Sequence, residues 1–333
     1  MSLLIAMPGP QPASTAADEP VLRDSLPALP ELTSLLTRAR RLADARDWRS
    51  GVMTALGAEQ GMGFGPATVA ARAISGLSDA VGLCFASPLH VVAGLSRVHL
   101  PPDGWLRLAA AESARWLAAF NVEFGGPDLR LHAIGANWLL EMPGAFAARD
   151  GAPEELLGLP LERTAARDDA ERALRRLGAE VEIWLADHEL NRAREARGLP
   201  SINSLWFWGG ARAGQVAPLT NAPRAIMVDG EIDAWLGGLA AHCAVSVAPA
   251  QDWHSLPLGQ DALLVLAPPR TGGSGEHWRS LETRWLQPAA HALRNRDLPA
   301  LRLQIGATAW QLPDPSPLRW LRRRRPWYLQ VAA

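Results

Sequence analysis

One stretch constrains the fold of this chain more than any other: residues 185–212, which read LADHELNRAREARGLPSINSLWFWGGAR. A helical pattern ends at Gly198 and Pro200, and an apolar strand follows over residues 202–208. Two indoles and a phenyl ring in succession are too bulky for a solvated loop, so we expect this strand to be buried on both faces in the middle of a sheet. Gly209-Gly210 then stand where the carboxyl edge of that sheet would lie, and α/β proteins place ligands at such an edge.

Strands alternate with helices through the second half of the chain. The segments Ala225–Asp229, Ala262–Ala267 and Leu301–Ile305 have the character of buried strands, and helical patterns separate them. This order predicts an α/β fold with a mostly parallel sheet flanked by helices, together with a smaller α+β N-terminal lobe built from shorter strands. We expect three parts: a disordered N-terminus over residues 1–25, the α+β lobe over 26–158 and the α/β lobe over 159–333.

The absence of lysine excludes several kinds of chemistry. Every one of the 33 Lys+Arg residues is arginine. A chain without lysine has no P-loop nucleotide site, no Schiff base and no anchor for pyridoxal phosphate. The formal net charge is -1, so no field over the whole molecule recruits nucleic acid or an anionic membrane. Any such role requires a local patch.

Cysteine use and the N-terminus point to a cytoplasmic protein. Cys84 and Cys243 stand far apart in apolar surroundings, which indicates two core thiols in a reducing compartment. The first residues lack the basic region of a secretory signal, and Pro8 ends their apolar run. No stretch approaches the roughly 18 apolar residues of a membrane span.

Polar residues on both sides of the apolar strand form the first candidate site. As a binding site they would hold an anion through Arg192, Arg212 and freed backbone amides. In the alternative interpretation, His188 caps core packing, Asn203 satisfies backbone groups and the arginines are solvated. The candidate ligand-binding residues are His188, Asn191, Arg192, Arg194, Asn203, Trp208, Gly209, Gly210 and Arg212.

Four acidic and imidazole side chains form an alternative metal site. Asp229 ends a strand, and Asp252, His254 and His277 follow it in the sequence. A hydrolytic metal site needs such ligands to converge on one or two ions, and here they are scattered along the chain. No Gly-x-Ser-x-Gly sequence is present, which argues against a serine hydrolase.

The densest basic run lies near the C-terminus. Arg322, Arg323, Arg324 and Arg325 are flanked by Trp320, Trp327 and Tyr328. Arginines interleaved with aromatic residues can bind single-stranded nucleic acid, whereas a short basic run at a terminus is more often solvated.

These residues carry a family resemblance. The segments LPALPEL, ASPLHVVAGLSRVHL and ELNRAREARGLPSINSLWFWGGAR resemble the RpfE-type regulatory proteins of proteobacteria. The last segment is also similar to part of the archaeal-type cofactor-independent phosphoglycerate mutases, which belong to the alkaline phosphatase superfamily. The positions that match the mutase pattern are His188, Asn191, Arg194, Gly198, Asn203, Trp208 and Gly209. The chain departs from the family patterns at Ser87, Glu189, Leu190 and Ala211.

The resemblance implies a truncated fold of the alkaline phosphatase type without the catalytic groups. The mutases use a serine nucleophile after an N-terminal Asp-Gly and two metal ions held by aspartates and histidines near both ends of the chain. The resemblance implies that the nucleophile segment and the Asp-His pair lie outside this chain, and that residues 263–293 keep a helix with Glu282 but not the metal ligands. Phosphoryl transfer would then lose nucleophile activation and charge neutralisation.

We therefore expect a non-catalytic regulatory or scaffold protein that needs no cofactor. Its partner would be a protein, or a phosphorylated or acidic small molecule held near Gly209. One alternative is an active metal-dependent phosphoglycerate mutase or phosphatase with ligands at Asp229, Asp252, His254 and His277. Another is a partner protein in nucleic acid metabolism that binds through Arg322–Arg325.

Overall fold

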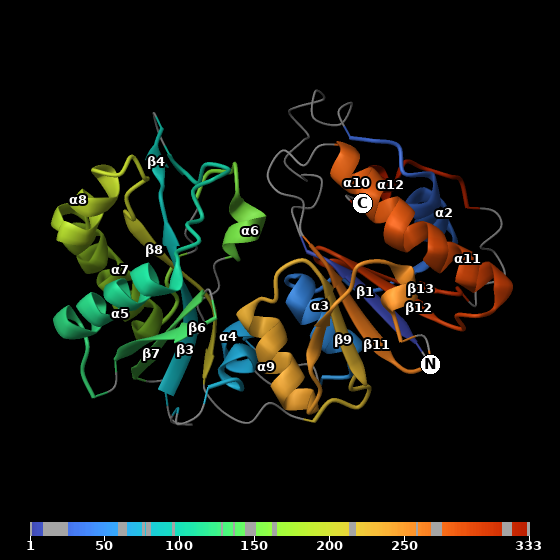
Figure 1. The fold of residues 1–333 in the computed structure, drawn as a ribbon, viewed down its shortest axis with the longest axis horizontal. Helices are drawn as coiled ribbons and strands as arrows, with labels where there is room; N and C mark the ends of the chain where they lie inside the picture. Colours follow the sequence, from blue (N-terminus) through green and yellow to red (C-terminus); the bar gives the residue numbers. More distant parts are fainter. Residues whose placement is uncertain are drawn as a thin grey trace. The chain divides into compact units, whose positions relative to one another are not determined.

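The computed structural model folds the chain into two compact units (Figure 1). Unit 1 contains Met1–Gln60, Pro218–Ile232 and Cys243–Ala333, and unit 2 contains Gly61–Ala217 and Asp233–His242. The side chains of Val81, Ala211 and Arg212 are not described. The structure describes residues 2–8, 26–58, 65–74, 77, 81–94, 97–127, 129–135, 137–143, 151–161, 165–212, 218–257, 259–267, 275–314 and 322–331.

Unit 1 is built on a seven-stranded, mostly parallel sheet with the order β10-β9-β11-β1-β12-β13-β2. The first five strands in this order are parallel, and β13 and β2 are antiparallel additions at one side. The expected α/β class with a mostly parallel sheet is confirmed. The strand bounds, in sheet order, are β10 Val247–Pro249, β9 Ala225–Asp229, β11 Ala262–Leu266, β1 Leu3–Met7, β12 Leu301–Ile305, β13 Thr308–Leu312 and β2 Arg40–Arg41.

The first strand of the chain lies inside this sheet. β1 pairs with β11 and with β12, and all five of its residues are buried. The expectation that residues 1–25 are disordered is therefore wrong for Leu3–Met7, while residues 9–25 lie outside the described part. Five apolar residues in a row can cover both faces of a parallel strand, so burial outweighs the Pro- and Ala-rich composition that follows them.

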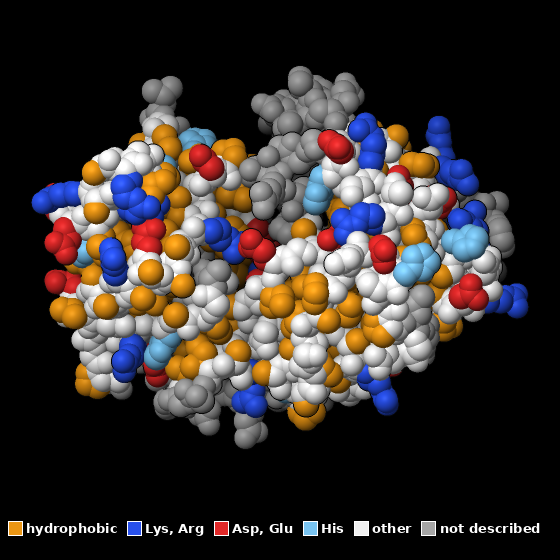
Figure 2. All heavy atoms as spheres, viewed as in Figure 1, with side chains coloured by type: hydrophobic (Ala, Val, Ile, Leu, Met, Phe, Trp, Pro, Cys, Tyr) orange, Lys and Arg blue, Asp and Glu red, His pale blue; other side chains and the backbone are white. Residues whose placement is uncertain are grey.

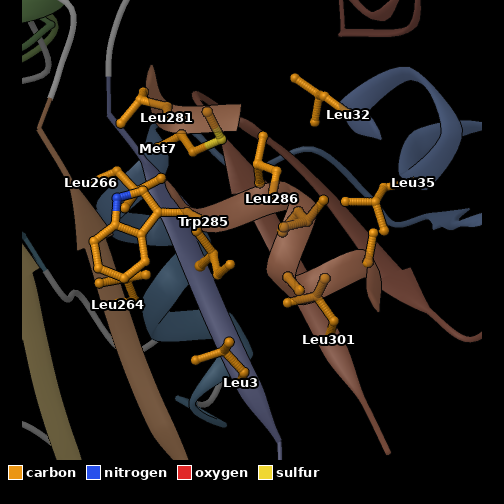
Figure 3. Close-up of a cluster of buried hydrophobic side chains, with 14 of the residues drawn as sticks. Leu3, Met7, Leu32, Leu35, Leu264, Leu266, Leu281, Trp285, Leu286 and Leu301 are labelled. Carbon is orange, nitrogen blue, oxygen red and sulfur yellow. The ribbon is translucent and has the colours of Figure 1, made fainter. Parts of the chain in front are cut away.

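Helices cover both faces of the unit 1 sheet. Helix α3 contacts β1, β12 and β13, whereas α2 and the helical segment that contains Trp285 pack in the cluster that includes Leu3, Ile5 and Met7. Figure 3 shows the Trp285 indole lying over Leu264 and Leu266, with Leu32 and Leu35 contributed by α2. The helices are α2 Pro30–Arg38, α3 Trp48–Ala55, the 3-10 helix η2 Trp253–Ser255, α10 Gly275–Leu281, the π-helix η3 Glu282–Leu286, α11 Gln287–Asn295 and α12 Trp327–Val331.

Unit 2 is built on a four-stranded antiparallel sheet with the order β6-β7-β3-β8. One face packs on α5 and α7 through Trp116, Phe120 and Val181, and the other packs on α4 through Ala67 and Ala70. The strands are β3 Val81–Leu89, β6 Arg130–Ile134, β7 Asn137–Pro143 and β8 Ser204–Arg212, with a separate hairpin of β4 Val92–Ala93 and β5 Val98–His99. The helices are α4 Pro66–Ala71, α5 Ala110–Glu123, α6 Pro153–Leu156, α7 Asp169–Asp187, α8 Glu189–Glu195 and α9 Ala234–Cys243.

The apolar strand that the sequence predicts over residues 202–208 is β8. Its residues 204–210 are all buried, and both sheet faces contribute to that burial, because Leu205 and Phe207 join one core while Trp206 and Trp208 join the other. However, among the described strands β8 pairs with β3 alone, antiparallel, and so lies at an edge of the unit 2 sheet. The expected central position at the carboxyl edge of a parallel sheet is wrong, because helices cover the apolar faces of this edge strand.

The division of the chain also differs from the expected lobes 26–158 and 159–333. Unit 2 interrupts the sequence of unit 1 after residue 60, and the chain returns to unit 1 at Pro218. Both units therefore cross the expected boundary at residue 158. The reason is that β1 pairs with strands more than 250 residues later, which sequence order alone does not reveal. Among the described residues, no helix has the length and apolar character needed to cross a bilayer.

Candidate functional site

The candidate ligand-binding residues of unit 2 begin at the junction of α7 and α8. The backbone of His188 is extended, which ends α7 and starts α8. His188 Nδ1 accepts a hydrogen bond from Leu190 N at 3.1 Å, and its ring lies 4.4 Å from the Trp184 ring and 4.8 Å from the Trp116 ring. Burial lowers the pKa of His188, against the raising effect of Glu189 and Glu123. The ring is a neutral helix cap at pH 7.

Asn191 and Arg194 hold the chain that leads into β8. Asn191 Nδ2 donates to the carbonyl oxygens of Leu185 and Ile202, each at 2.7 Å, and its Oδ1 accepts from Ile202 N at 2.8 Å. Arg194 Nε donates to Pro200 O at 2.8 Å, and its Nη1 forms an ion pair with Glu112. Both side chains are buried. Their polar groups therefore fix the turn between α8 and β8, while Arg192 in the same helix is exposed.

Asn203, just before β8, also forms hydrogen bonds between its side-chain amide and the backbone. Its Oδ1 accepts from Val91 N at 2.7 Å, and its Nδ2 donates to Val91 O at 2.8 Å. The side chain thus pairs with the backbone as a neighbouring strand would, beyond the end of the β3–β8 ladder. This is the scaffold role that the alternative interpretation gave to Asn203.

The other candidates lie at the far end of β8. Trp208 Nε1 donates to Ser87 Oγ at 2.9 Å, and the indole stacks on Phe85 at 4.5 Å between centroids. Gly209 has φ of 63°, and a Cβ there would lie 3.2 Å from Pro66 Cβ, so glycine permits both the turn of the backbone and the approach of α4. Gly210 is buried. Arg212 pairs through its backbone with Gly82.

The structure therefore separates the unit 2 candidates into two groups. Asn203 and Gly209 are six positions apart along extended backbone, which corresponds to about 20 Å. His188, Asn191, Arg194 and Asn203 surround the start of β8, and Trp208, Gly209 and Gly210 lie near its end. No one small anion can touch both groups, and ligand binding by either group remains a prediction.

The carboxyl edge of the unit 1 sheet contains the candidate metal ligand with the most defined geometry. Asp229 ends β9, and its two carboxylate oxygens are bonded: Oδ1 accepts from Arg284 Nη2 at 2.9 Å, and Oδ2 accepts from Trp285 Nε1 at 2.8 Å. The same guanidinium donates to Gln251 O from Nε at 3.1 Å and from Nη2 at 2.7 Å. The Asp229 carboxylate is 15% exposed.

The π-helix η3 supplies these partners, which are not among the site residues predicted from the sequence. Pro288 lacks an N–H and its ring clashes with the carbonyl four residues earlier, so a widened turn before α11 relieves the conflict. Glu282 in the same turn accepts hydrogen bonds from Glu31 N at 2.7 Å and Leu32 N at 3.0 Å, at the start of α2. Burial raises the pKa of Glu282. The proline within a helical pattern was the available signal.

The remaining metal candidates have separate roles. Asp252 caps η2 by accepting from Ser255 N at 3.1 Å, and His254 is exposed. His277 lies on α10 with its Nε2 buried and without a hydrogen-bond partner in the described part of the chain. Over the described residues, no three His, Cys, Asp or Glu side chains form a group that could hold a metal ion. The described residues therefore do not bring the four predicted metal ligands together at one point.

Comparisons with known proteins give matches only among solved structures. No family model matches the chain, and no curated protein matches it. A cofactor-independent phosphoglycerate mutase from Thermoplasma acidophilum is 14% identical with a TM-score of 0.46, over 100% of this chain and 94% of that one. The PH0037 protein from Pyrococcus horikoshii is 12% identical with a TM-score of 0.49, over 99% of this chain and 92% of that one.

Proposed function

We propose that this chain is a non-catalytic regulatory or scaffold protein that acts by binding a protein partner. The observation that carries the proposal is the bonding of Asp229, the carboxylate at the end of a central parallel strand. Arg284 and Trp285 each occupy one of its oxygens. In an α/β protein this position is where a ligand or ion is expected, and here it holds a helix against the sheet.

Electrostatics supports this proposal. A divalent ion on Asp229 would share the carboxylate with the Arg284 guanidinium, whose nitrogen lies 2.9 Å from Oδ1. Two unit charges about 4 Å apart repel by about 4 kcal/mol at an effective dielectric constant of about 20, and a divalent ion doubles that value. Arg284 would have to leave both Asp229 and Gln251 O before the ion could bind.

A protein partner suits the unit 2 candidates better than a small anion near Gly209. Gly209 and Gly210 are buried, and Pro66 of α4 lies against Gly209. The polar atoms of Asn191 and Asn203 are already bonded to backbone groups. A small molecule would have to open these contacts, whereas a protein partner can use the outer surface that they support.

The test measures metal content and turnover with a matched pair of variants. We expect purified protein to carry no stoichiometric manganese or zinc and to show no phosphatase or phosphoglycerate mutase activity. Asp229→Asn should lower the melting temperature because Arg284 loses its charged partner. Asp252→Asn should leave it unchanged because asparagine caps a helix as well as aspartate does.

The outcome that contradicts the proposal is specific. Stoichiometric metal together with turnover, both lost in Asp229→Asn and in Asp252→Asn, would favour the metal-dependent mutase or phosphatase. The buried and unbonded Nε2 of His277 is the observation that favours this second candidate. His277→Ala would then reduce metal content without a comparable loss of stability.

A further inference from the structure

The tertiary structure of unit 1 joins two separate parts of the sequence into one basic surface. Helix α2 ends at Arg38, and β2 follows at once with Arg40 and Arg41. The C-terminal run reaches the same place, because Arg322 Nη1 donates to the carbonyl oxygen of Ala39. We call this surface the basic strip, and its members are Arg38, Arg41, Arg322, Arg323, Arg324 and Arg325.

Arg302 and Arg40 form a separate basic pair on the other face of the sheet, because Leu301 and Leu303 point into the core that contains α2, whereas Gln304 lies against Gly51 of α3. In the register of the three strands, Gln311 of β13 lies between Arg302 of β12 and Arg40 of β2. Residues opposite each other in antiparallel strands share a face, so the two guanidinium groups flank the Gln311 amide. Arg40 Nη2 donates to Gln311 Oε1 at 3.4 Å. Burial lowers the pKa of Arg302 and the charge of Arg40 lowers it further, as expected for two cations that lie close together.

The anchoring of α12 spreads the C-terminal arginines along α2. Trp327 Nε1 donates to Pro27 O at 3.0 Å, just before α2 begins, whereas Arg322 is bonded at Ala39, just after it ends. Gln330 Nε2 is bonded to Thr33 O at 3.3 Å between these points. A helix of nine residues is about 13 Å long, so residues 322–326 run beside α2 over that length. The C-terminal arginines therefore form a row of residues along α2.

Few acidic groups neutralise this row. In the described part of unit 1, the ion pairs within the basic strip are Arg41 with Asp44 at 3.0 Å and Arg322 with Asp314 at 2.6 Å. Arg38, Arg323, Arg324 and Arg325 are exposed. Figure 2 shows blue arginine side chains over the part of unit 1 that carries α2 and α11. A molecule with a net charge of -1 thus concentrates positive charge on one edge of unit 1.

We propose that the basic strip binds the phosphate backbone of a nucleic acid without reading its bases. Guanidinium groups bind phosphate oxygens in a bidentate manner, and a row of them matches a row of phosphates. Trp310 and Trp327 of this region are buried, so neither indole can stack on an unpaired base or insert into a bilayer. Contact through phosphates alone therefore fits the surface better than base stacking or an anionic membrane does.

The test is the salt dependence of binding to a fluorescein-labelled DNA duplex of about 20 base pairs, measured by fluorescence anisotropy with the full chain. The strip variant changes Arg323, Arg324 and Arg325 to Gln. Each phosphate contact contributes about 0.9 to the slope of log K against log salt, so this variant should reduce the slope by about 2 to 3. We expect its affinity to fall more than tenfold at about 50 mM salt. Lysine at the same three positions should retain most of the binding.

The control variant changes three exposed arginines of unit 2, namely Arg115, Arg176 and Arg197, to Gln. It carries the same change in net charge and should keep the wild-type slope. Equal melting temperatures for the strip and control variants establish that folding is not the cause. Equal loss of binding in both variants, no binding at about 50 mM salt, or binding only to phosphatidylserine vesicles would each overturn the proposal.

Discussion

The two sheets of this protein differ in how far along the chain their neighbouring strands lie. In unit 1, Leu3 of β1 is opposite Ala262 on one side and Leu301 on the other. In unit 2, β6 and β7 form a hairpin in which Ile134 is opposite Asn137. Parallel neighbours need long connections, whereas antiparallel neighbours can be joined by a tight turn. The hairpin could therefore be predicted from local sequence, and the centre of the parallel sheet could not.

The two units also use buried polar side chains differently. In unit 2, Asn191 and Asn203 bond mainly to backbone groups and fix the path of the chain at the start of β8. In unit 1, Asp229 bonds to the side chains of Arg284 and Trp285 and fixes a helix on the sheet. The first arrangement determines local chain geometry, and the second determines packing between distant elements. Four predictions test this difference, in order of decreasing effect.

The largest effect is expected at the centre of the unit 1 sheet. Ile5 is fully buried in β1, and Ile5→Asp places a charge without a partner in the core between the sheet and its helices. The cost of several kcal/mol is comparable to the whole stability of a domain, about 5 to 15 kcal/mol. Hydrogen exchange should show loss of protection in unit 1 with protection retained in the unit 2 sheet. Val122→Asp, at an 86% exposed position, is the control. Equal loss of protection in both units would contradict the prediction that the loss is confined to unit 1.

A smaller loss is expected where η3 packs on the sheet. Trp285 is fully buried, and Trp285→Ala should cost about 3 to 5 kcal/mol through the cavity and the lost bond to Asp229. Trp285→Phe keeps most of the ring but removes the N–H, so it should cost about 1 to 3 kcal/mol. Urea unfolding measures both. If the two substitutions cost the same, the bond and not the packing holds this helix.

The matching change in unit 2 concerns the Asn191 amide. Asn191→Leu preserves size but leaves the Leu185 and Ile202 carbonyls and the Ile202 N–H without their partner. We expect a loss of about 3 kcal/mol, confined to unit 2. Arg192→Ala, at the next and exposed position, should change the unfolding free energy by less than about 0.5 kcal/mol. A loss that spreads to unit 1 in hydrogen exchange would contradict the local role.

The smallest effect is a pH dependence in unit 2. The pKa of His188 in the folded chain is lower than its ordinary value of 6.5, so the folded state binds fewer protons than the unfolded state. The stability from neutral His188 is complete above pH 6.5 and is lost as the pH falls below it. His188→Asn keeps a capping side chain and should show a flatter fall in the urea midpoint over this range. Identical pH profiles for the two proteins would refute this role.

The candidate site was only partly predictable from the sequence. The chemical character of β8 was clear, and its burial on both faces is confirmed, because no solvated loop accommodates residues 204–210. Arg284 and Trp285 could not be paired with Asp229, because the π-turn before Pro288 sets which side chains face the end of β9. The basic strip was visible only as residues 322–325. Its other members, Arg38 and Arg41, lie beside this run because Arg322 is bonded to the carbonyl oxygen of Ala39.

By itself, the sequence determined the elements with strong local signals, strands Ala225–Asp229 and Leu301–Ile305, and it excluded chemistry that needs lysine. Only the tertiary structure decided that Leu3–Met7 lies at the centre of the parallel sheet and that β8 lies at the edge of an antiparallel one. The physical reason is that an apolar run specifies burial but not the neighbour that buries it. That choice depends on packing summed over the whole chain.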